Sequence, residues 1–151
     1  MIRPFSLLQL KNKMKSKGKI SLRENHRRSL TSTLMIVEQL LIEIEDLMTS
    51  QYRTCCFEIK NDVEIEKINQ NLKVIEDARK QICKLAEKYD TDLHTQSLQR
   101  IIDVKKTKIW EILCDSKAKK LKGFGEFPKK LIEEYDKDID ELMTIAAKIK
   151  Y

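Results

Sequence analysis

Apolar residues between Lys19 and Lys122 recur every three or four positions, the spacing that places them along one face of a helix. The same window contains no glycine and no proline. All five of these residues lie outside it, at Pro4, Gly18, Gly123, Gly125 and Pro128. Glycine loses the most backbone entropy in a helix and proline removes a backbone donor, so their absence permits long helices. The pattern predicts an all-α protein.

The first predicted helix begins near Ser21 and runs to about residue 48. Ser21 and Glu24 have the spacing of a capping box, in which each side chain satisfies a backbone donor near the other. The apolar seam of this helix recurs in steps of four and three and comprises Leu30, Leu34, Val37, Leu41, Ile44 and Met48. Three further residues widen it to the breadth of a bundle helix, namely Ile36, Leu40 and Leu47.

Residues 49–61 lose the pattern and predict a connection whose apolar residues tuck under the helices; they include Tyr52, Cys55, Cys56, Phe57 and Ile59. The second predicted helix begins at Asn61 or Asp62 and carries a favourable i,i+4 pair, Glu76 and Lys80. Its seam comprises Ile65, Ile68, Leu72, Ile75, Ile82, Ala86 and Tyr89. Residues 90–92 are rich in capping residues and predict its end.

The third predicted helix runs from about Leu93 to Lys122, with a seam of Leu98, Ile101, Ile102, Ile109, Ile112 and Leu113. Lysines crowd its last turns and Gly123 follows, as expected at the negative end of a helix. Pro128 suits the first turn of the fourth helix, where its missing donor costs nothing. The seam of that helix comprises Leu131, Ile132, Tyr135, Ile139, Leu142, Met143, Ala146 and Ile149.

Four long helices joined by short connections favour antiparallel neighbours. We therefore predict an antiparallel up-down-up-down four-helix bundle with coiled-coil-like packing, formed by a single domain over residues 21–151. A basic N-terminal arm, residues 1–20, precedes it.

The net charge of +6 is unevenly distributed along the chain. Residues 1–30 hold nine basic residues and one acidic residue, whereas the remaining 121 residues hold 21 basic and 23 acidic ones. We interpret the arm as a mobile, solvated tail or as an extension upstream of the true start codon. The alternative is attachment to nucleic acid, through residues 1–30, or to an anionic membrane surface.

The four cysteines and two histidines show no metal-ligand spacing. Cys55, Cys56, Cys83 and Cys114 include no C-x-x-C pair, and adjacent cysteines do not readily bridge each other or share one zinc ion. We expect buried, reduced thiols. His26 and His94 have no glutamate three residues before them, which excludes the di-iron carboxylate bundles.

The remaining catalytic patterns are incomplete. Glu43 with Asp46, and Glu133 with Asp136, have the spacing of Mg²⁺-binding carboxylates, but no E-x-x-E partner lies on another helix. We expect solvated helix charges there. Residues 123–125 are glycine-rich but lack the strand and the Gly-Lys-Ser/Thr ending of a phosphate loop. No catalytic residue, metal ligand or cofactor site is predicted, and we expect a protein that is not an enzyme.

A candidate polar cluster comprises Arg79, Asp103 and Lys105. Arg79 and Lys105 occupy positions where the seams of the second and third helices expect apolar residues. If these helices form a hairpin that turns near Thr91, Arg79 lies level with Asp103. We predict an Arg79–Asp103 contact or an Arg79/Lys105 group shared with Glu76. The alternative is that both long side chains extend to solvent from the edge of the seam.

A candidate interaction surface follows the third helix and comprises Lys117, Lys119, Lys120, Lys122, Phe124 and Phe127. Two aromatic residues beside a lysine cluster could contact an acidic partner or a nucleic-acid backbone. The preferred interpretation is structural, with both phenylalanines closing the end of the bundle.

Three functions remain open. The leading one is a non-enzymatic helical module that associates with another protein or with itself, for which Met35 and Ile42 are surplus apolar residues. The second is a nucleic-acid-associated protein that uses the arm. The least favoured is an enzyme with a carboxylate site. No segment is long enough to span a bilayer, and residues 5–10 are short for a signal-peptide core, so we expect a cytoplasmic protein.

Overall fold

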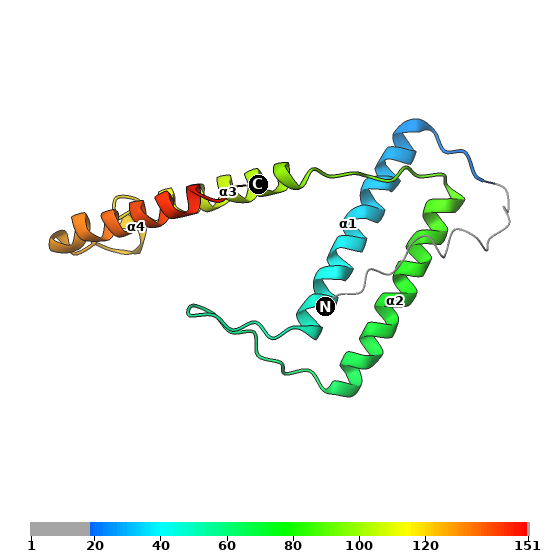
Figure 1. Cartoon of the computed structure of the whole chain (residues 1–151), viewed down its shortest axis with the longest axis horizontal. Helices are drawn as coiled ribbons and strands as arrows, with labels where there is room; N and C mark the ends of the chain where they lie inside the picture. The colour runs from blue at the N-terminus through cyan, green and yellow to red at the C-terminus, as the bar shows by residue number, and fades with distance from the viewer. Residues whose placement is uncertain (1–18, 151) are drawn as a thin grey trace. The chain divides into compact units, whose positions relative to one another are not determined.

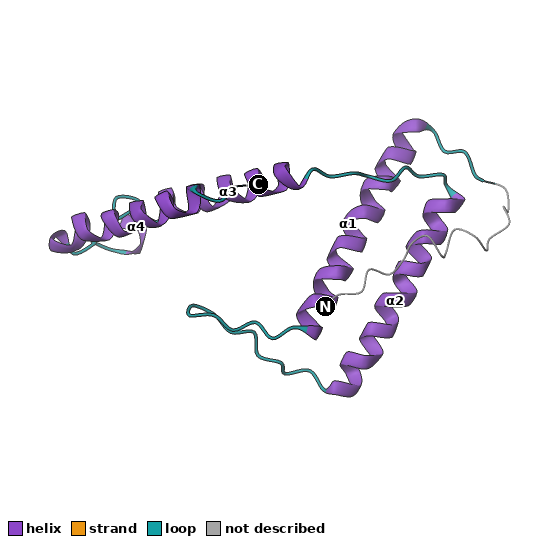
Figure 2. Ribbon diagram, viewed as in Figure 1, coloured by secondary structure: helices purple, strands orange, loops and turns teal. Residues whose placement is uncertain are grey.

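The computed structural model describes residues 19–150, which contain four α-helices (Figures 1 and 2). They are α1 (Glu24–Thr49), α2 (Ile65–Lys88), α3 (Leu98–Asp115) and α4 (Ile132–Ala147). Two short 3₁₀ helices, η1 (Leu121–Phe124) and η2 (Lys129–Leu131), lie between α3 and α4. Between residues 19 and 150 there is no β-strand, only an isolated bridge between Arg53 and Glu58. The all-α prediction is confirmed.

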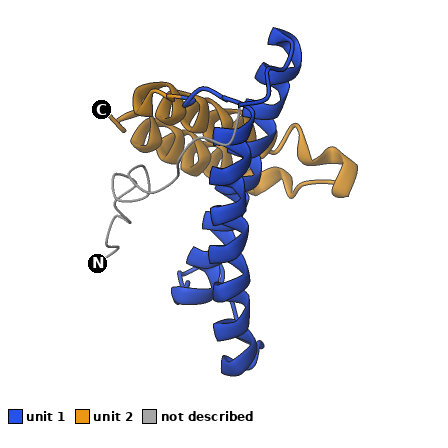
Figure 3. Ribbon diagram, turned by 90° about the vertical axis from the view of Figure 1, so that its right-hand side faces the viewer, with its two compact units in different colours: residues 1–94 blue, residues 95–151 orange. Residues whose placement is uncertain are grey.

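The chain divides into two compact units, residues 1–94 and 95–151 (Figure 3). In the described part of the first unit, α1 and α2 run antiparallel and pack together as the α1/α2 hairpin. In the second unit, α3 and α4 form the α3/α4 hairpin in the same way. Each hairpin has an up-down course, although its connection is longer than predicted: residues 50–64 join α1 to α2, and residues 116–131 join α3 to α4. The joining of both hairpins into one four-helix bundle stays a prediction.

The core of the α1/α2 hairpin lies along α2. Ile68, Ile75 and Ile82, spaced seven residues apart, are the buried residues of this helix. A seven-residue repeat returns to the same face of a helix after two turns, so all three face α1. These are the central positions of the predicted seam. Ile65, the first residue of the same seam, is exposed because it is also the first residue of the helix.

The start of α1 differs from the prediction. The helix begins at Glu24, its N-cap is Arg23, and no side chain caps it, so the predicted capping box with Ser21 is wrong. The carboxylate of Glu24 instead accepts hydrogen bonds from Arg27 and Arg28, at 2.8 Å in each case. Two charged donors in the next turn outcompete a backbone N–H for the same carboxylate, because charge-assisted hydrogen bonds are the stronger ones.

The end of α2 follows the prediction and has a defined cap. Asp90 has a φ of 50°, in the left-handed region that follows many helices. The amide of Asp90 donates to the carbonyl of Glu87 at 3.3 Å, and the amide of Thr91 donates to the carbonyl of Ala86 at 3.0 Å. This pair of hydrogen bonds is a Schellman motif with aspartate in place of the usual glycine.

Residues 50–64 connect α1 to α2, which begins at Ile65 rather than at the predicted Asn61 or Asp62. The amide of Ile59 donates to the carbonyl of Tyr52 at 2.8 Å, next to the Arg53–Glu58 bridge. The loop thus satisfies part of its backbone within itself, and its apolar residues stay exposed. The prediction that they tuck under the helices is wrong.

The end of α3 also differs from the prediction. The helix starts at Leu98, after Ser97, whose hydroxyl accepts from the amide of Arg100, and ends at Asp115. The predicted start near Leu93 and the predicted end at Lys122 are therefore wrong, and the positive φ belongs to Gly125 rather than to Gly123. The amide of Ala118 instead donates to the carboxylate of Asp136 on α4 at 2.9 Å, which turns the chain away from the helix axis.

Candidate interaction surfaces

Five aliphatic side chains of α1 lie exposed along one side of the helix. Between 43% and 52% of the surface of each is accessible, and they are Ile36, Val37, Leu40, Ile44 and Leu47. We call this set the α1 stripe. At 1.5 Å per residue it extends about 17 Å along the helix. A contiguous apolar surface of this kind is typical of a contact site.

The α1 stripe is not the side of α1 that faces α2. The half-buried residues of α1 include Leu34, Leu41 and Met48, together with Glu38 and Glu45. At about 100° per residue, the centre of that side lies roughly a third of a turn from the centre of the stripe. The predicted seam is therefore divided, with one edge packed against α2 and the other edge open.

Arg79 accounts for the two glutamates on the side of α1 that faces α2. Its Nε lies 3.6 Å from a carboxylate oxygen of Glu38, and its Nη1 lies 3.7 Å from one of Glu45. The Nε is buried and these separations exceed hydrogen-bonding distance, so the contact is electrostatic. Burial and the carboxylates of Glu38 and Glu87 raise the pKa of the neighbouring Cys83 thiol. The sequence placed Arg79 in an apolar seam without showing which helix supplies its partners.

The other residues of the predicted polar cluster lie in the second unit. Asp103 and Lys105 both belong to α3, so their contact with Arg79 stays a prediction. Glu76 pairs with Lys80 at 2.7 Å, which confirms the predicted i,i+4 pair.

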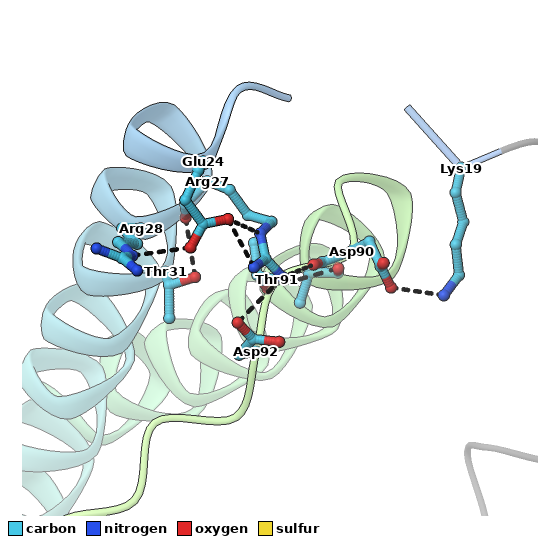
Figure 4. Close-up of polar contacts among 9 residues, drawn as sticks. Lys19, Glu24, Arg27, Arg28, Thr31, Asp90, Thr91 and Asp92 are labelled. Atoms are coloured by element: carbon cyan, nitrogen blue, oxygen red, sulfur yellow. Dashed lines mark hydrogen bonds and ion pairs between the residues drawn. The ribbon is translucent and has the colours of Figure 1, made fainter. Parts of the chain in front are cut away.

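A network of charges ties the start of α1 to the end of α2 (Figure 4). Arg27 lies 2.8 Å from Glu24 and 3.0 Å from Asp92, and Lys19 contacts Asp90 at 2.5 Å. These partners lower the pKa of the Glu24 and Asp90 carboxyl groups and raise the pKa of Arg27. The amide of Ile20 also donates to the carbonyl of residue 88 at 2.8 Å. These contacts connect the start of α1 to the end of α2. The charge of Arg27 is balanced by carboxylates of the same hairpin.

The lysine- and phenylalanine-containing surface lies in the connection between α3 and α4. Lys117 pairs with Asp140 at 2.6 Å, and this carboxylate raises the pKa of the Lys117 ammonium group. Lys119, Lys120 and Lys122 are exposed. Phe127 packs on Tyr135 with ring centroids 4.8 Å apart. Phe124 is 92% exposed, so it does not close the end of a hairpin, and the structural interpretation fits Phe127 alone.

The α3/α4 hairpin contains a shallow groove of about 300 Å³. It is lined mainly by apolar residues of both helices, including Ile109, Trp110, Leu113 and Met143. Lys106 also lines the groove and donates to the carbonyl of Ile149 at 2.7 Å. A single lysine, already engaged with a carbonyl, offers no acid–base pair. The groove was not predicted, because it depends on how α3 and α4 are aligned.

Among residues 19–150, no cluster of three or more histidine, cysteine, aspartate or glutamate side chains is arranged to hold a metal ion. The carboxylate of Asp136, a member of one predicted pair, accepts a hydrogen bond from the amide of residue 118. Cys83 and Cys114 are half-buried, but Cys55 and Cys56 are exposed, so the expectation of buried thiols is wrong for that pair.

Comparisons with protein families, with curated proteins and with solved structures found no match. Within the described part of the chain, none of the helices combines the length and apolar character that crossing a membrane requires. The basic arm predicted for residues 1–20 lies almost wholly outside the described residues, as does most of the charge on which nucleic-acid binding would depend.

Proposed function

We propose that this chain acts without catalysis, by associating with another helical hairpin through the α1 stripe. One observation carries the proposal: Ile36, Val37, Leu40, Ile44 and Leu47 are aligned and half exposed, while α2 packs on a different side of α1. A helix whose apolar arc is wider than the surface that its neighbour covers needs a second neighbour.

The size of the stripe sets the strength of the contact. Burying a whole aliphatic side chain contributes about 1.5–3 kcal/mol, so covering the exposed half of five contributes about 4–7 kcal/mol per copy. Two copies that face each other gain about twice this amount. Association itself costs about 4–15 kcal/mol, so the net gain is at most about 10 kcal/mol, an affinity no tighter than tens of nanomolar.

A second copy of the chain is the partner that the helix lengths favour. The helices of the α1/α2 hairpin have 26 and 24 residues, whereas α3 and α4 have 18 and 16. Two α1/α2 hairpins therefore match along their whole length and form an intermolecular four-helix bundle with twofold symmetry. The alternative is the bundle predicted from the sequence, in which the α3/α4 hairpin of the same chain covers the stripe.

The double variant Leu40→Glu/Ile44→Glu tests the proposal, because it places two charges in the centre of the stripe. We expect light scattering to show a dimer for the wild-type chain and a monomer for the variant. Ile42→Glu is the matched control, since Ile42 is an exposed aliphatic residue of the same helix that lies roughly half a turn from Leu40.

The results separate the partners. A wild-type chain that is monomeric at every concentration, but loses helical stability in the double variant, supports the intramolecular bundle. A dimer that Ile42→Glu dissociates and Leu40→Glu/Ile44→Glu preserves contradicts the stripe as the contact surface.

A further inference from the structure

The loop between α1 and α2 presents two adjacent thiols at its tip. Cys55 and Cys56 are both exposed, and their sulfur atoms lie 3.4 Å apart. The sequence alone argued against a role for this pair, because adjacent cysteines are poor disulfide partners. It did not show that both side chains point to the same side of the backbone.

The backbone on either side of the pair forms a tight turn. The amide of Thr54 donates to the carbonyl of Phe57 at 2.8 Å. The Thr54 hydroxyl accepts from the amides of Cys56 and Phe57, at 3.3 and 3.2 Å. The bridge between Arg53 and Glu58 pairs the backbone on the two sides of this turn. The two cysteines are therefore the central residues of a two-residue turn, and the residues on both sides of the turn hold it in place.

This geometry suits an atom that bridges the sulfurs better than a bond between them. A disulfide needs a sulfur–sulfur distance of about 2.05 Å and Cα atoms about 4.4–6.8 Å apart. Cα atoms joined by a trans peptide bond are about 3.8 Å apart, so the backbone would have to distort. Two sulfur–metal bonds of about 2.3 Å that meet at roughly 95–110° span about 3.4–3.8 Å. The two thiols share an S–H···S hydrogen bond at 3.4 Å, so their sulfurs already lie at the lower limit of this range.

We propose that Cys55 and Cys56 form a two-thiolate binding site for a soft, thiophilic centre of pyramidal geometry, of which trivalent organoarsenic is the simplest. Such a centre keeps its own organic substituent and needs only two thiolates. Within residues 19–150, no third histidine, cysteine, aspartate or glutamate side chain joins the pair in a metal-binding cluster. A tetrahedral zinc ion, which takes four ligands, is therefore not the preferred occupant.

The binding step is balanced without an oxidant. An aryl arsenoxide and two thiols give an arsenic dithiolate and one water molecule. Two arsenic–sulfur bonds form, the arsenic–oxygen bond breaks, and the two thiol protons leave with the oxygen. Arsenic stays trivalent and both sulfurs keep their oxidation state.

Phenylarsine oxide tests the site on the full chain, after reduction with a phosphine. In the presence of a competing monothiol, we expect intact-mass spectrometry to show one arsenic per chain for the wild type and none for Cys55→Ser or Cys56→Ser, whose single thiolate holds arsenic more weakly. The Cys83→Ser/Cys114→Ser double variant keeps the adduct, because those thiols belong to α2 and α3 and not to the loop. Helical circular dichroism is unchanged in the loop variants, which shows that they fold.

Competition with thiols supplies the decisive measurement. Once one thiolate has bound arsenic, the other is held beside it at a high effective concentration. Displacing arsenic from the wild-type chain therefore needs about 100-fold more monothiol than displacing it from either single variant. The proposal is overturned if both single variants retain arsenic as firmly as the wild type. It is equally overturned if a low-molecular-weight disulfide converts the pair to a Cys55–Cys56 disulfide that excludes arsenic.

Discussion

Ile75 is the residue on which the packing of α1 against α2 most depends. It lies midway between Ile68 and Ile82 and is 6% exposed. Replacing a buried isoleucine with alanine costs about 2–5 kcal/mol, depending on how well the surroundings close around the cavity. No side chain among the described residues is buried to below 2% exposure, so neighbours and water close readily. We therefore expect Ile75→Ala to lower the free energy of unfolding by about 2–3 kcal/mol.

The two hairpins can be followed separately in one urea titration. Trp110 is the only tryptophan and belongs to α3, so its fluorescence reports on the α3/α4 hairpin, whereas far-ultraviolet circular dichroism reports on all helices. Ile75→Ala shifts part of the dichroism transition to lower urea and leaves the fluorescence midpoint unchanged, at a fixed protein concentration. Val74→Ala is the control, because Val74 is 65% exposed on the same helix.

Two results would bear against this reasoning. A loss for Ile75→Ala no larger than that for Val74→Ala, about 0.5 kcal/mol or less, means that Ile75 is not in the core. A fluorescence transition that moves together with the dichroism transition means that both hairpins unfold as one bundle.

Three further predictions concern the polar contacts. Asp90→Gly is expected to be about 1 kcal/mol more stable than Asp90→Ala by urea titration. Both variants lose the ion pair with Lys19, but only glycine adopts the left-handed conformation freely. Equal stabilities would contradict the helix cap. Partners lower the pKa of Glu24 and Asp90 below their ordinary values of 4.5 and 3.8, so the stability that they supply is present above about pH 4.5 and lost as the pH falls through the folded-state values. Thermal melts from pH 6 to pH 2 check this, and an unchanged acid dependence in Glu24→Gln/Asp90→Asn would refute it. Tyr135→Phe removes a 2.7 Å hydrogen bond to the carbonyl of Ser116 and is expected to cost about 0.5–1.5 kcal/mol, measured by Trp110 fluorescence; no loss would show that water replaces the hydroxyl.

Periodicity predicted the helices of this protein well, because each must bury one apolar side. Ile68, Ile75 and Ile82 were recognisable from their spacing alone. The α1 stripe was visible as part of a broad seam, but the sequence does not show how much of that seam α2 covers. That division depends on the side of α1 where Glu38 and Glu45 meet Arg79, a contact between residues more than 30 positions apart.

The ends of the helices were predicted less well, because local signals competed with contacts elsewhere. Ser21 and Glu24 match a capping box, yet Glu24 has two arginines within one turn. The lysines before Gly123 resemble the end of a helix. The helix nevertheless ends earlier in the chain, where the amide of Ala118 donates to the carboxylate of Asp136. The exposed thiols of Cys55 and Cys56 depend on a turn that no helical pattern describes.

Sedimentation equilibrium over a wide range of concentrations is the sharpest test of whether two copies associate through the α1 stripe. We expect a chain of 17.8 kDa at low concentration that approaches twice this mass at tens to hundreds of micromolar, while Leu40→Glu/Ile44→Glu stays at the lower mass throughout. A wild-type chain that stays at 17.8 kDa over the whole range, with the double variant equally stable, would contradict it.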